Sequence, residues 1–227
     1  MQRTARHTQR LKLFITIFIT SAFTTFAQTP EKAICAVCRV LEGTHEPEKV
    51  VATADYQGQK YYFCAKKCKK LFEQEPASYV LPEFPRPAPN FSVTSLTGET
   101  VTLENYKGKV VLLDFWATWC KPCVHTMPSL QKLYDQFSTR NFSVLGVAID
   151  EQGEKKVKAF VKKHRLTYPI FLDAKTNPAW ETYKVKVIPA MFLIDASGQI
   201  VQQWTGEPDF KEVEQMVENL ISKTKEP

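Results

Sequence analysis

The chain has 227 residues, which is enough for one or two domains. Hydrophobic residues make up 44% of it and aromatic residues 12%, so it can form packed cores and is not generally disordered. The net charge of +6 is concentrated at the start: residues 1–27 hold four basic residues and no acidic one, and the remainder carries only +2. Such a small surplus excludes the basic surface typical of nucleic-acid-binding proteins.

Residues 1–27 have the pattern of a secretory signal peptide. A basic segment precedes the apolar run Leu13–Phe23, and Thr25-Phe26-Ala27 then precedes Gln28. The apolar run is shorter than the roughly 20 residues that span a bilayer, and an uncleaved membrane anchor is the alternative. We therefore expect an exported protein, periplasmic or otherwise extracytoplasmic, in a compartment that permits disulfides.

Residues 28–80 are expected to form a small cysteine-rich α+β module. Residues 50–56 and 60–63 have strand-forming composition and flank a turn at residues 57–59. The sequence after Cys64 predicts a short helix that ends before Pro76. The helical spacing places Cys68, Leu71 and Phe72 on one face.

Four of the six cysteines lie in this module, as Cys35-x-x-Cys38 and Cys64-x-x-x-Cys68. Two such thiol pairs can converge on one tetrahedral ion, and zinc, copper or another soft metal prefers thiolate ligands. The alternative is two disulfides, which staple exported domains too small for a sufficient core. His45 is a weaker candidate ligand, and its loop position also suits a solvated histidine.

Part of the module resembles a known metal-binding family. The segment YYFCAKKCKKLF at residues 61–72, followed by Pro76 and Tyr79, is similar to the YHS/TRASH-type module. The resemblance covers residues 34–80. It implies metal ligation by one upstream cysteine and a C-x-x-x-C pair, to which Cys38, Cys64 and Cys68 correspond, with Cys35 as an additional fourth ligand.

A proline-rich segment separates this module from the rest of the chain. Residues 81–89 contain four prolines, a composition that favours extended polyproline II and a semi-rigid spacer. We place the domain boundary there, with a second domain at residues 90–227.

The second domain alternates strands and helices, which predicts a mixed sheet with helices on both faces. The expected elements are a hairpin of residues 91–93 and 100–103, strands 110–116 and 142–149, a helix from the 120s to about 137, helix 154–165, a helical turn at 178–183, a hairpin of 191–194 and 199–204, and a final helix 209–222.

The chemical signal of this domain is a C-x-x-C motif at the junction of a strand and a helix. The apolar strand Val110–Trp116 is followed by Trp119-Cys120-Lys121-Pro122-Cys123, and a helical pattern begins there. A cysteine at a helix N-terminus has its pKa lowered by the unpaired backbone N–H groups and the helix dipole. A redox-active pair is therefore favoured over a structural disulfide or half of a zinc site.

The sequence LLDFWATWCKPC closely resembles the thioredoxin superfamily, and residues 88–109 and 150–173 resemble its TlpA/ResA branch. The resemblance covers about residues 89–220 and implies a thioredoxin fold and thiol–disulfide oxidoreductase activity. It further implies protein disulfide substrates, an upstream electron donor and no cofactor for the redox chemistry. The P-x-x-x-T-x-x-C context of a peroxiredoxin nucleophile is absent around Cys120.

We expect the first cysteine, Cys120, to be the more exposed nucleophile and Cys123 to be the buried resolving cysteine. Asp114 lies six residues before Cys120 in an otherwise apolar strand. Burial raises the pKa of a carboxyl group, which suits Asp114 to accept the proton of Cys123. A strand-end aspartate in a cap or salt bridge is the alternative.

The thioredoxin resemblance also implies a substrate-binding surface. Ile188-Pro189 precedes a strand as the cis-proline loop does in that superfamily, where it lies beside the C-x-x-C and offers backbone groups to an extended substrate. Trp119 is expected to line the surface. Trp116 is expected either to line it too or to pack in the core.

Two residues near the motif bear on the resemblance to the TlpA/ResA branch. Thr126 stands where TlpA/ResA-like proteins often have a glutamate, so the proton transfer falls on Asp114 and a cytochrome c maturation role is not indicated. His125 is interpreted as an exposed helix residue. Lys121-Pro122 implies, by resemblance, a reductant or a moderate couple. The competing functions are a metal-handling protein whose redox domain keeps thiols reduced, and a non-catalytic adaptor, which the intact cysteine pair disfavours.

Overall fold

The computed structural model describes residues 29–43, 46–80, 82–151 and 153–224. Among these residues, no helix has both the length and the apolar composition needed to cross a bilayer. The predicted signal peptide and His45 lie outside the described residues.

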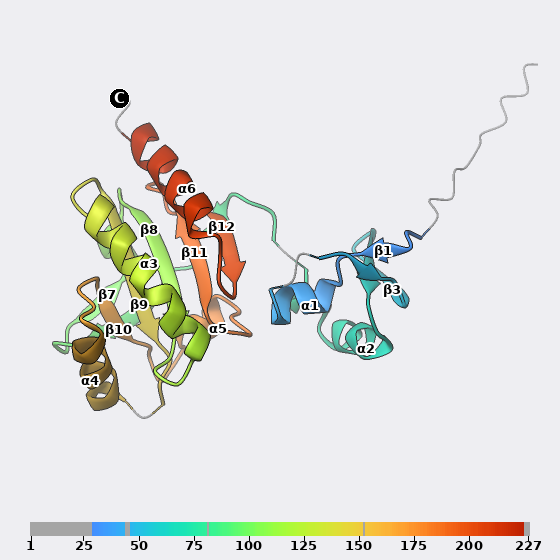
Figure 1. Cartoon of the computed structure of the whole chain (residues 1–227), viewed down its shortest axis with the longest axis horizontal. Helices are drawn as coiled ribbons and strands as arrows, with labels where there is room; N and C mark the ends of the chain where they lie inside the picture. Colours follow the sequence, from blue (N-terminus) through green and yellow to red (C-terminus); the bar gives the residue numbers. More distant parts are fainter. Residues whose placement is uncertain (1–28, 44–45, 81, 152, 225–227) are drawn as a thin grey trace, which may run out of the picture. The chain divides into compact units, whose positions relative to one another are not determined.

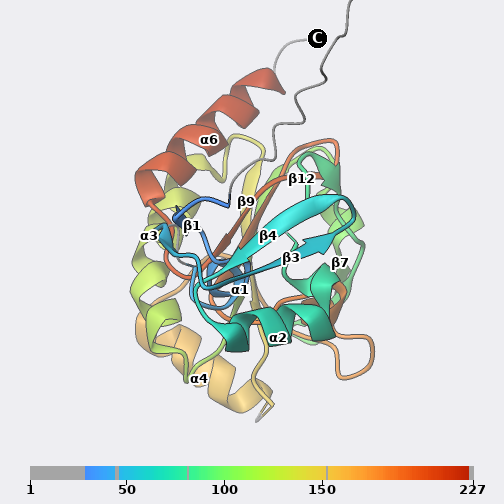
Figure 2. The same cartoon turned by 90° about the vertical axis from the view of Figure 1, so that its right-hand side faces the viewer.

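The cysteine-rich module contains two short antiparallel pairings and two helices (Figure 2). The hairpin pairs Ala52 with Phe63 and Tyr56 with Gln59, close to the predicted strands. In chain order the elements are β1 (Lys32–Ala33), α1 (Ala36–Leu41), β2 (Glu48–Lys49), β3 (Ala52–Tyr56), β4 (Gln59–Phe63), α2 (Lys66–Gln74) and the 3₁₀ turn η1 (Pro76–Ser78).

The core of this module is built around Phe72 on α2. Its ring centroid lies 4.8 Å from that of Tyr61 and 5.1 Å from that of Phe63. The continuous helix α2 places Cys68, Leu71 and Phe72 on one face, as predicted. Cys68 and Phe72 are buried, whereas Leu71 is 39% exposed, so the small core covers only part of that face.

The second domain is organised around an eight-stranded mixed sheet of order β5-β12-β11-β8-β9-β10-β6-β7 (Figure 1). The parallel strands β8, β9 and β10 form its centre, and β11 runs antiparallel beside β8. The strands are β5 (Arg86–Pro87), β6 (Ser92–Ser95), β7 (Thr100–Thr102), β8 (Val110–Trp116), β9 (Phe142–Ala148), β10 (Ile170–Leu172), β11 (Ala190–Ile194) and β12 (Gln199–Thr205).

Two apolar layers cover the sheet, because successive strand residues point to opposite faces. Every residue of β8 and β9 is buried, as expected for strands covered on both sides. One layer packs α3 (Lys121–Phe137), α4 (Glu154–His164) and α6 (Phe210–Lys223) on the sheet, and the other packs α5 (Ala179–Thr182) and the 3₁₀ turn η2 (Leu103–Tyr106). This arrangement confirms the predicted fold class.

Candidate active site and cysteine cluster

The C-x-x-C motif lies where β8 ends and α3 begins. Cys120 is the N-cap residue of α3, and Pro122 occupies the first turn, where its missing N–H costs no hydrogen bond. Cys120 and Cys123 form a disulfide, and the backbone N–H of Cys123 donates to the Cys120 sulfur at 3.2 Å. Cys120 is 5% exposed and Cys123 is fully buried, so the expected order of exposure is right, although the difference is small.

A buried carboxylate fixes the loop before the motif. Asp150 follows β9, and its carboxylate accepts hydrogen bonds from the backbone N–H of Thr118 at 2.9 Å and from the Thr118 hydroxyl. Sequence inspection missed this residue, because it lies 32 positions away from its partner. The available signal was the parallel pairing of β8 and β9, which places their carboxyl ends at one edge of the sheet.

The predicted cis-proline loop lies beside the disulfide. The Ile188–Pro189 peptide bond is cis, as predicted, and the Ile188 carbonyl oxygen is 3.8 Å from the Cys120 sulfur. Trp119 is 64% exposed at the mouth of a groove of about 690 Å³. The groove is also lined by Trp180, Val187 and Ile188, so apolar surface and backbone groups meet next to the reactive sulfur.

Trp116 does not line this surface. Its side chain is fully buried, and its ring centroid lies 5.3 Å from that of Phe160 on α4. The core alternative is therefore correct. The alternation of β8 explains it, because Trp116 shares the face of Leu112 that α3 and α4 cover.

Asp114 lies in the middle of β8 and is 1% exposed. Its register partners are Gly146 on β9 and Met191 on β11, and neither offers a side-chain hydrogen bond. Both carboxyl oxygens lack a hydrogen-bond partner among the described residues. Burial raises the pKa of Asp114 to about 7. The alternative of a cap or a salt bridge is not what the structure contains.

The two residues that follow Cys123 differ in environment. Thr126 is buried, and its hydroxyl donates to the Cys123 carbonyl oxygen at 2.9 Å, so it satisfies a backbone group of its own helix. His125 is exposed and lies 3.4 Å from the Glu207 carboxylate, as a surface residue would.

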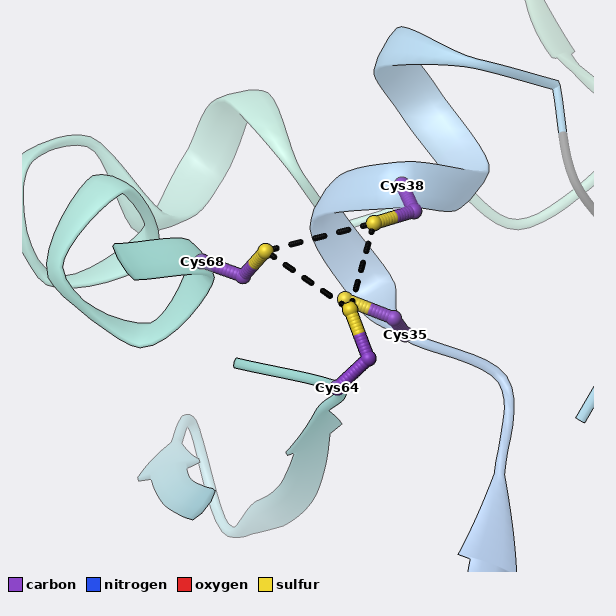
Figure 3. A group of neighbouring side chains, drawn as sticks. All are labelled: Cys35, Cys38, Cys64 and Cys68. Carbon is purple, nitrogen blue, oxygen red and sulfur yellow. Dashed lines mark hydrogen bonds between the residues drawn. The ribbon is translucent and has the colours of Figure 1, made fainter. Parts of the chain in front are cut away.

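The four cysteines of the first module converge. Their sulfur atoms all lie within 4.8 Å of one another, and the Cys38 sulfur is 3.5 Å from that of Cys64 and 3.9 Å from that of Cys68 (Figure 3). All four are free thiols. A tetrahedral zinc site with Zn–S bonds of 2.3 Å has sulfur atoms about 3.8 Å apart, so the separations fit a metal rather than a disulfide.

The local structure explains this convergence. Cys35 is the N-cap residue of α1 and Cys38 lies in its first turn, whereas Cys64 follows β4 and Cys68 lies on α2. Burial alone raises the pKa of Cys35. Hydrogen bonds from the backbone N–H groups of Cys38 and Cys64 act in the opposite direction and contribute to a net lowering of this pKa. Burial raises the pKa of Cys38 to about 12. Burial also raises the pKa of Cys64, so without an ion Cys38 and Cys64 stay protonated.

The fold and the disulfide beside a cis-proline loop define a thioredoxin-like thiol–disulfide oxidoreductase. Residues 85–203 match the AhpC/TSA family model, and residues 42–83 match the YHS domain model. The chain belongs to the AhpC/TSA family and carries a YHS domain. The YHS match includes Cys64 and Cys68 and begins after Cys38.

Curated relatives support the same class. The chain is 37% identical over 138 residues to the thiol-disulfide oxidoreductase ResA of Bacillus thuringiensis subsp. konkukian. The aligned residues cover 61% of this chain and 79% of that protein. It is 40% identical over 133 residues to the thioredoxin-like protein YneN of Bacillus subtilis, covering 58% and 76% of the two chains.

Solved structures agree with the fold. A putative thiol:disulfide interchange protein DsbE from Chlorobium tepidum superposes with a TM-score of 0.55 at 28% identity, covering 63% of this chain and 99% of that one. A putative protein disulfide isomerase from Bacteroides thetaiotaomicron superposes with a TM-score of 0.57 at 30% identity, covering 63% and 92%.

Proposed function

We propose that this oxidoreductase is exported and reduces disulfides of protein substrates, with Cys120 as the nucleophile and Cys123 as the resolving cysteine. The observation that carries the proposal is the position of the pair. Cys120 is the N-cap residue of α3 beside the Ile188 carbonyl, and Cys123 is buried one turn further on. The helix N-terminus favours the Cys120 thiolate, and burial reserves Cys123 for the intramolecular step.

The reaction is a two-step thiol–disulfide exchange. The Cys120 thiolate attacks one sulfur of the substrate disulfide, a mixed disulfide forms, and one substrate thiolate leaves. Deprotonated Cys123 then attacks the Cys120 sulfur and releases the second substrate thiolate. The substrate gains two electrons and the protein retains the Cys120–Cys123 disulfide, so each cycle requires an upstream dithiol donor.

Asp114 takes the proton of Cys123 in the second step. Its side chain lies on the face of β8 that α3 covers, and burial raises its pKa to about 7, near the pH at which a general base works best. Among the described residues, Asp114 is the acidic residue that is buried as a whole, and both oxygens of the nearby Asp150 carboxylate already accept hydrogen bonds from Thr118. Thr126 replaces the glutamate frequent in the TlpA/ResA branch and cannot accept a proton there.

Trp119, Ile188 and Pro189 hold the substrate. An extended peptide can pair with the backbone of the cis-proline loop, and exposed Trp119 can cover an apolar side chain next to the substrate cysteine. The groove beside Trp119 supports this assignment.

Reduction of insulin by dithiothreitol tests the catalytic assignment. The wild-type chain should accelerate precipitation of the insulin B chain, and Cys120→Ser should lose the acceleration. Cys123→Ser is the matched control, because it should still form the mixed disulfide but accumulate it. Equal rates for the wild type and Cys120→Ser would refute the assignment.

The reducing direction rests on Lys121-Pro122 between the two cysteines and is tested by the reduction potential of the pair. Equilibration with glutathione buffers, read by alkylation of Cys120, should give a value nearer to that of thioredoxin than to that of a strong oxidant. A strongly oxidising potential would reverse the direction.

Export rests on the sequence of residues 1–27 and is tested by expression in a Gram-negative host. The product should be recovered from the periplasm with a new N-terminus at Gln28. Recovery of the full-length chain in the membrane fraction would indicate an uncleaved anchor instead.

We propose a second function for residues 28–80, the binding of one zinc or copper ion by Cys35, Cys38, Cys64 and Cys68. The separations of 3.5–3.9 Å among three of the sulfurs and the free state of all four thiols support it. When bound, the ion would hold the two helices and the hairpin together. Elemental analysis of untagged protein should find one ion per chain, and Cys64→Ser with Cys68→Ser should lose it. No ion and no free thiols in this module would refute the site.

The two functions can be coupled, with the redox domain maintaining the thiols of the module or of a metalloprotein client. Arg86–Pro87 pairs with β12 as strand β5, so the part of the proline-rich segment that would then separate the two units is residues 81–85, which limited proteolysis there would support. A change in insulin reduction on adding the metal, lost in the Cys64→Ser, Cys68→Ser double variant, would favour coupling. If the metal leaves insulin reduction unchanged, the two functions are independent of each other.

A further inference from the structure

Polar atoms of three side chains are buried in the layer beneath α3 without a hydrogen-bond partner among the described residues. They are both carboxyl oxygens of Asp114, Nε1 of Trp116 and the hydroxyl of Tyr168. The three residues are at most 2% exposed. Unpaired buried polar groups are costly and rare, so three of them in one layer require a common explanation.

Gly146 brings these groups to one place. A Cβ atom at Gly146 would lie 2.6 Å from Ile170 Cδ1, 3.1 Å from Trp116 Nε1 and 3.1 Å from the Tyr168 ring, so the indole and the phenol ring both pack closely against this glycine. Asp114 is the register partner of Gly146 on the adjacent strand. Asp114 and Trp116 are two residues apart on β8 and therefore point to the same face.

We propose that Trp116 and Tyr168 hold a water molecule against the Asp114 carboxyl group, and that this donor set positions the base of the oxidoreductase reaction. The water accepts hydrogen bonds from the indole N–H and the tyrosine O–H and donates to a carboxylate oxygen. Three polar partners are what a buried water needs. The arrangement gives a hydrogen-bond partner to the indole N–H, the tyrosine O–H and one of the two carboxyl oxygens.

Besides the cysteines, the titratable side chain that interacts with Asp114 is that of Tyr168. The titratable side chains in this layer include Cys120, Cys123, Tyr168, the half-buried Tyr134 and the half-buried His164, whose ring stacks on Phe160. The elements β11, α4 and α6 contribute apolar side chains to it: Met191, Leu193, Val157, Phe160, Val161, Phe210, Val213, Met216, Val217, Leu220 and Ile221.

Tyr168 stays a donor throughout the working pH range. Burial, and to a lesser degree the charge of Asp114, raise the pKa of Tyr168 well above its ordinary value. The tyrosine O–H and the indole N–H orient the water so that it donates to the carboxylate, and they thereby stabilise the ionised form of Asp114, which is the form that accepts the proton of Cys123. The inference rests on the proposed role of Asp114 and adds Tyr168 and Trp116 as positioning residues.

The test is an infrared titration of the full oxidised chain. The C=O stretching band of a protonated buried carboxyl group reports the titration of Asp114, and its loss in Asp114→Asn identifies it. Tyr168→Phe removes only the hydroxyl, so the titration midpoint should move about one pH unit or more to higher pH. Tyr134→Phe is the matched control, because it makes the same change in the same layer and should leave the midpoint in place.

An unchanged midpoint in Tyr168→Phe, or an equal shift in Tyr134→Phe, would overturn the inference. If Tyr168→Phe does not fold, Trp116→Phe decides by the same criterion, because it removes the indole N–H and keeps an aromatic ring. The pH profile of mixed-disulfide resolution should move with the infrared midpoint. If Asp114→Asn resolves at the wild-type rate, the proposed role of Asp114 fails, whereas the hydrogen-bonded cluster is still judged by the infrared shift.

Discussion

The chain contains two C-x-x-C motifs that begin in the same way and end differently. Cys35 and Cys120 are each the N-cap residue of a helix, and each has its partner three residues on. Cys120 and Cys123 are joined in a disulfide, whereas Cys35 and Cys38 are free and meet the sulfurs of Cys64 and Cys68. The spacing alone therefore does not decide the chemistry.

The surroundings of each pair account for the difference. Around Cys120, the nearby groups are a cis-proline loop, an exposed tryptophan and a buried carboxyl group, which suit substrate access and proton transfer. Around Cys35, the nearby groups are two more thiols and a small aromatic core. A helix N-terminus favours a thiolate in both places, and the neighbours determine whether that thiolate meets a disulfide or a metal.

The largest effect is expected from replacing the N-cap cysteine of each motif by serine, one motif at a time. Cys120→Ser should abolish insulin reduction and keep the bound ion, because it removes the nucleophile and leaves the first module intact. Cys35→Ser makes the same change at the other N-cap and should show the reverse, with the ion lost or weakened and reduction retained. Loss of both properties in either variant would contradict the division of roles.

The next effect concerns folding of the first module. Removing the ion with a chelator, or the double change Cys64→Ser and Cys68→Ser, should unfold residues 28–80 and lower their thermal midpoint, because metal binding to such sites contributes about 10 kcal/mol or more. Amide hydrogen exchange followed by mass spectrometry measures this for each segment. The peptides of residues 110–116 should keep their protection, and equal loss in both regions would contradict independent stabilities.

Asp114→Asn should change both catalysis and the pH dependence of stability. Resolution of the mixed disulfide should slow by about 10²-fold, the usual contribution of a positioned base. Burial raises the pKa of Asp114 from 3.8 to about 7, so between these pH values the folded chain binds a proton that the unfolded chain has released. Stability should therefore fall as pH rises through this window, by about 4 kcal/mol in total, and level off above it.

Urea denaturation of the wild type and Asp114→Asn at several pH values measures that trend. The difference in the free energy of unfolding should grow in favour of the variant as pH rises from about 4 to about 7. A constant difference across this range would show that Asp114 keeps an ordinary pKa.

A smaller effect is expected for Gly146→Ala. The added Cβ would lie 2.6 Å from Ile170 Cδ1 and 3.1 Å from Trp116 Nε1, so the core must shift to accept it. Overpacking of this kind costs about 1–3 kcal/mol, which chemical denaturation would detect. Gly198→Ala is a useful contrast, because its Cβ would meet no atom within 4 Å and only its positive φ of 85° opposes the change.

Local patterns were sufficient for the main elements of the fold. Hydrophobic runs predict the buried strands β8 and β9. A motif with a defined structural context predicts the helix after Cys120. The short helix α1 was missed, because its six residues are too few for a periodic pattern. Its formation depends on packing against α2 and the hairpin, which no local signal contains.

The site residues divide in the same way. The sequence was enough to select Asp114 and the cis-proline, because a charged residue in an apolar strand and a family motif both stand out. Asp150, Tyr168 and Gly146 could not be selected, because each matters through a partner distant in the sequence. The position of Trp116 could not be decided before the strand register was known.

The most direct test of the central comparison is the intact mass of the purified, unreduced chain under native and denaturing conditions. We predict one metal ion on the folded chain, and after denaturation with alkylation one disulfide and four modified thiols, with Cys120–Cys123 as the only pair protected. Three disulfides and no ion would contradict the account, because both C-x-x-C motifs would then be oxidised alike.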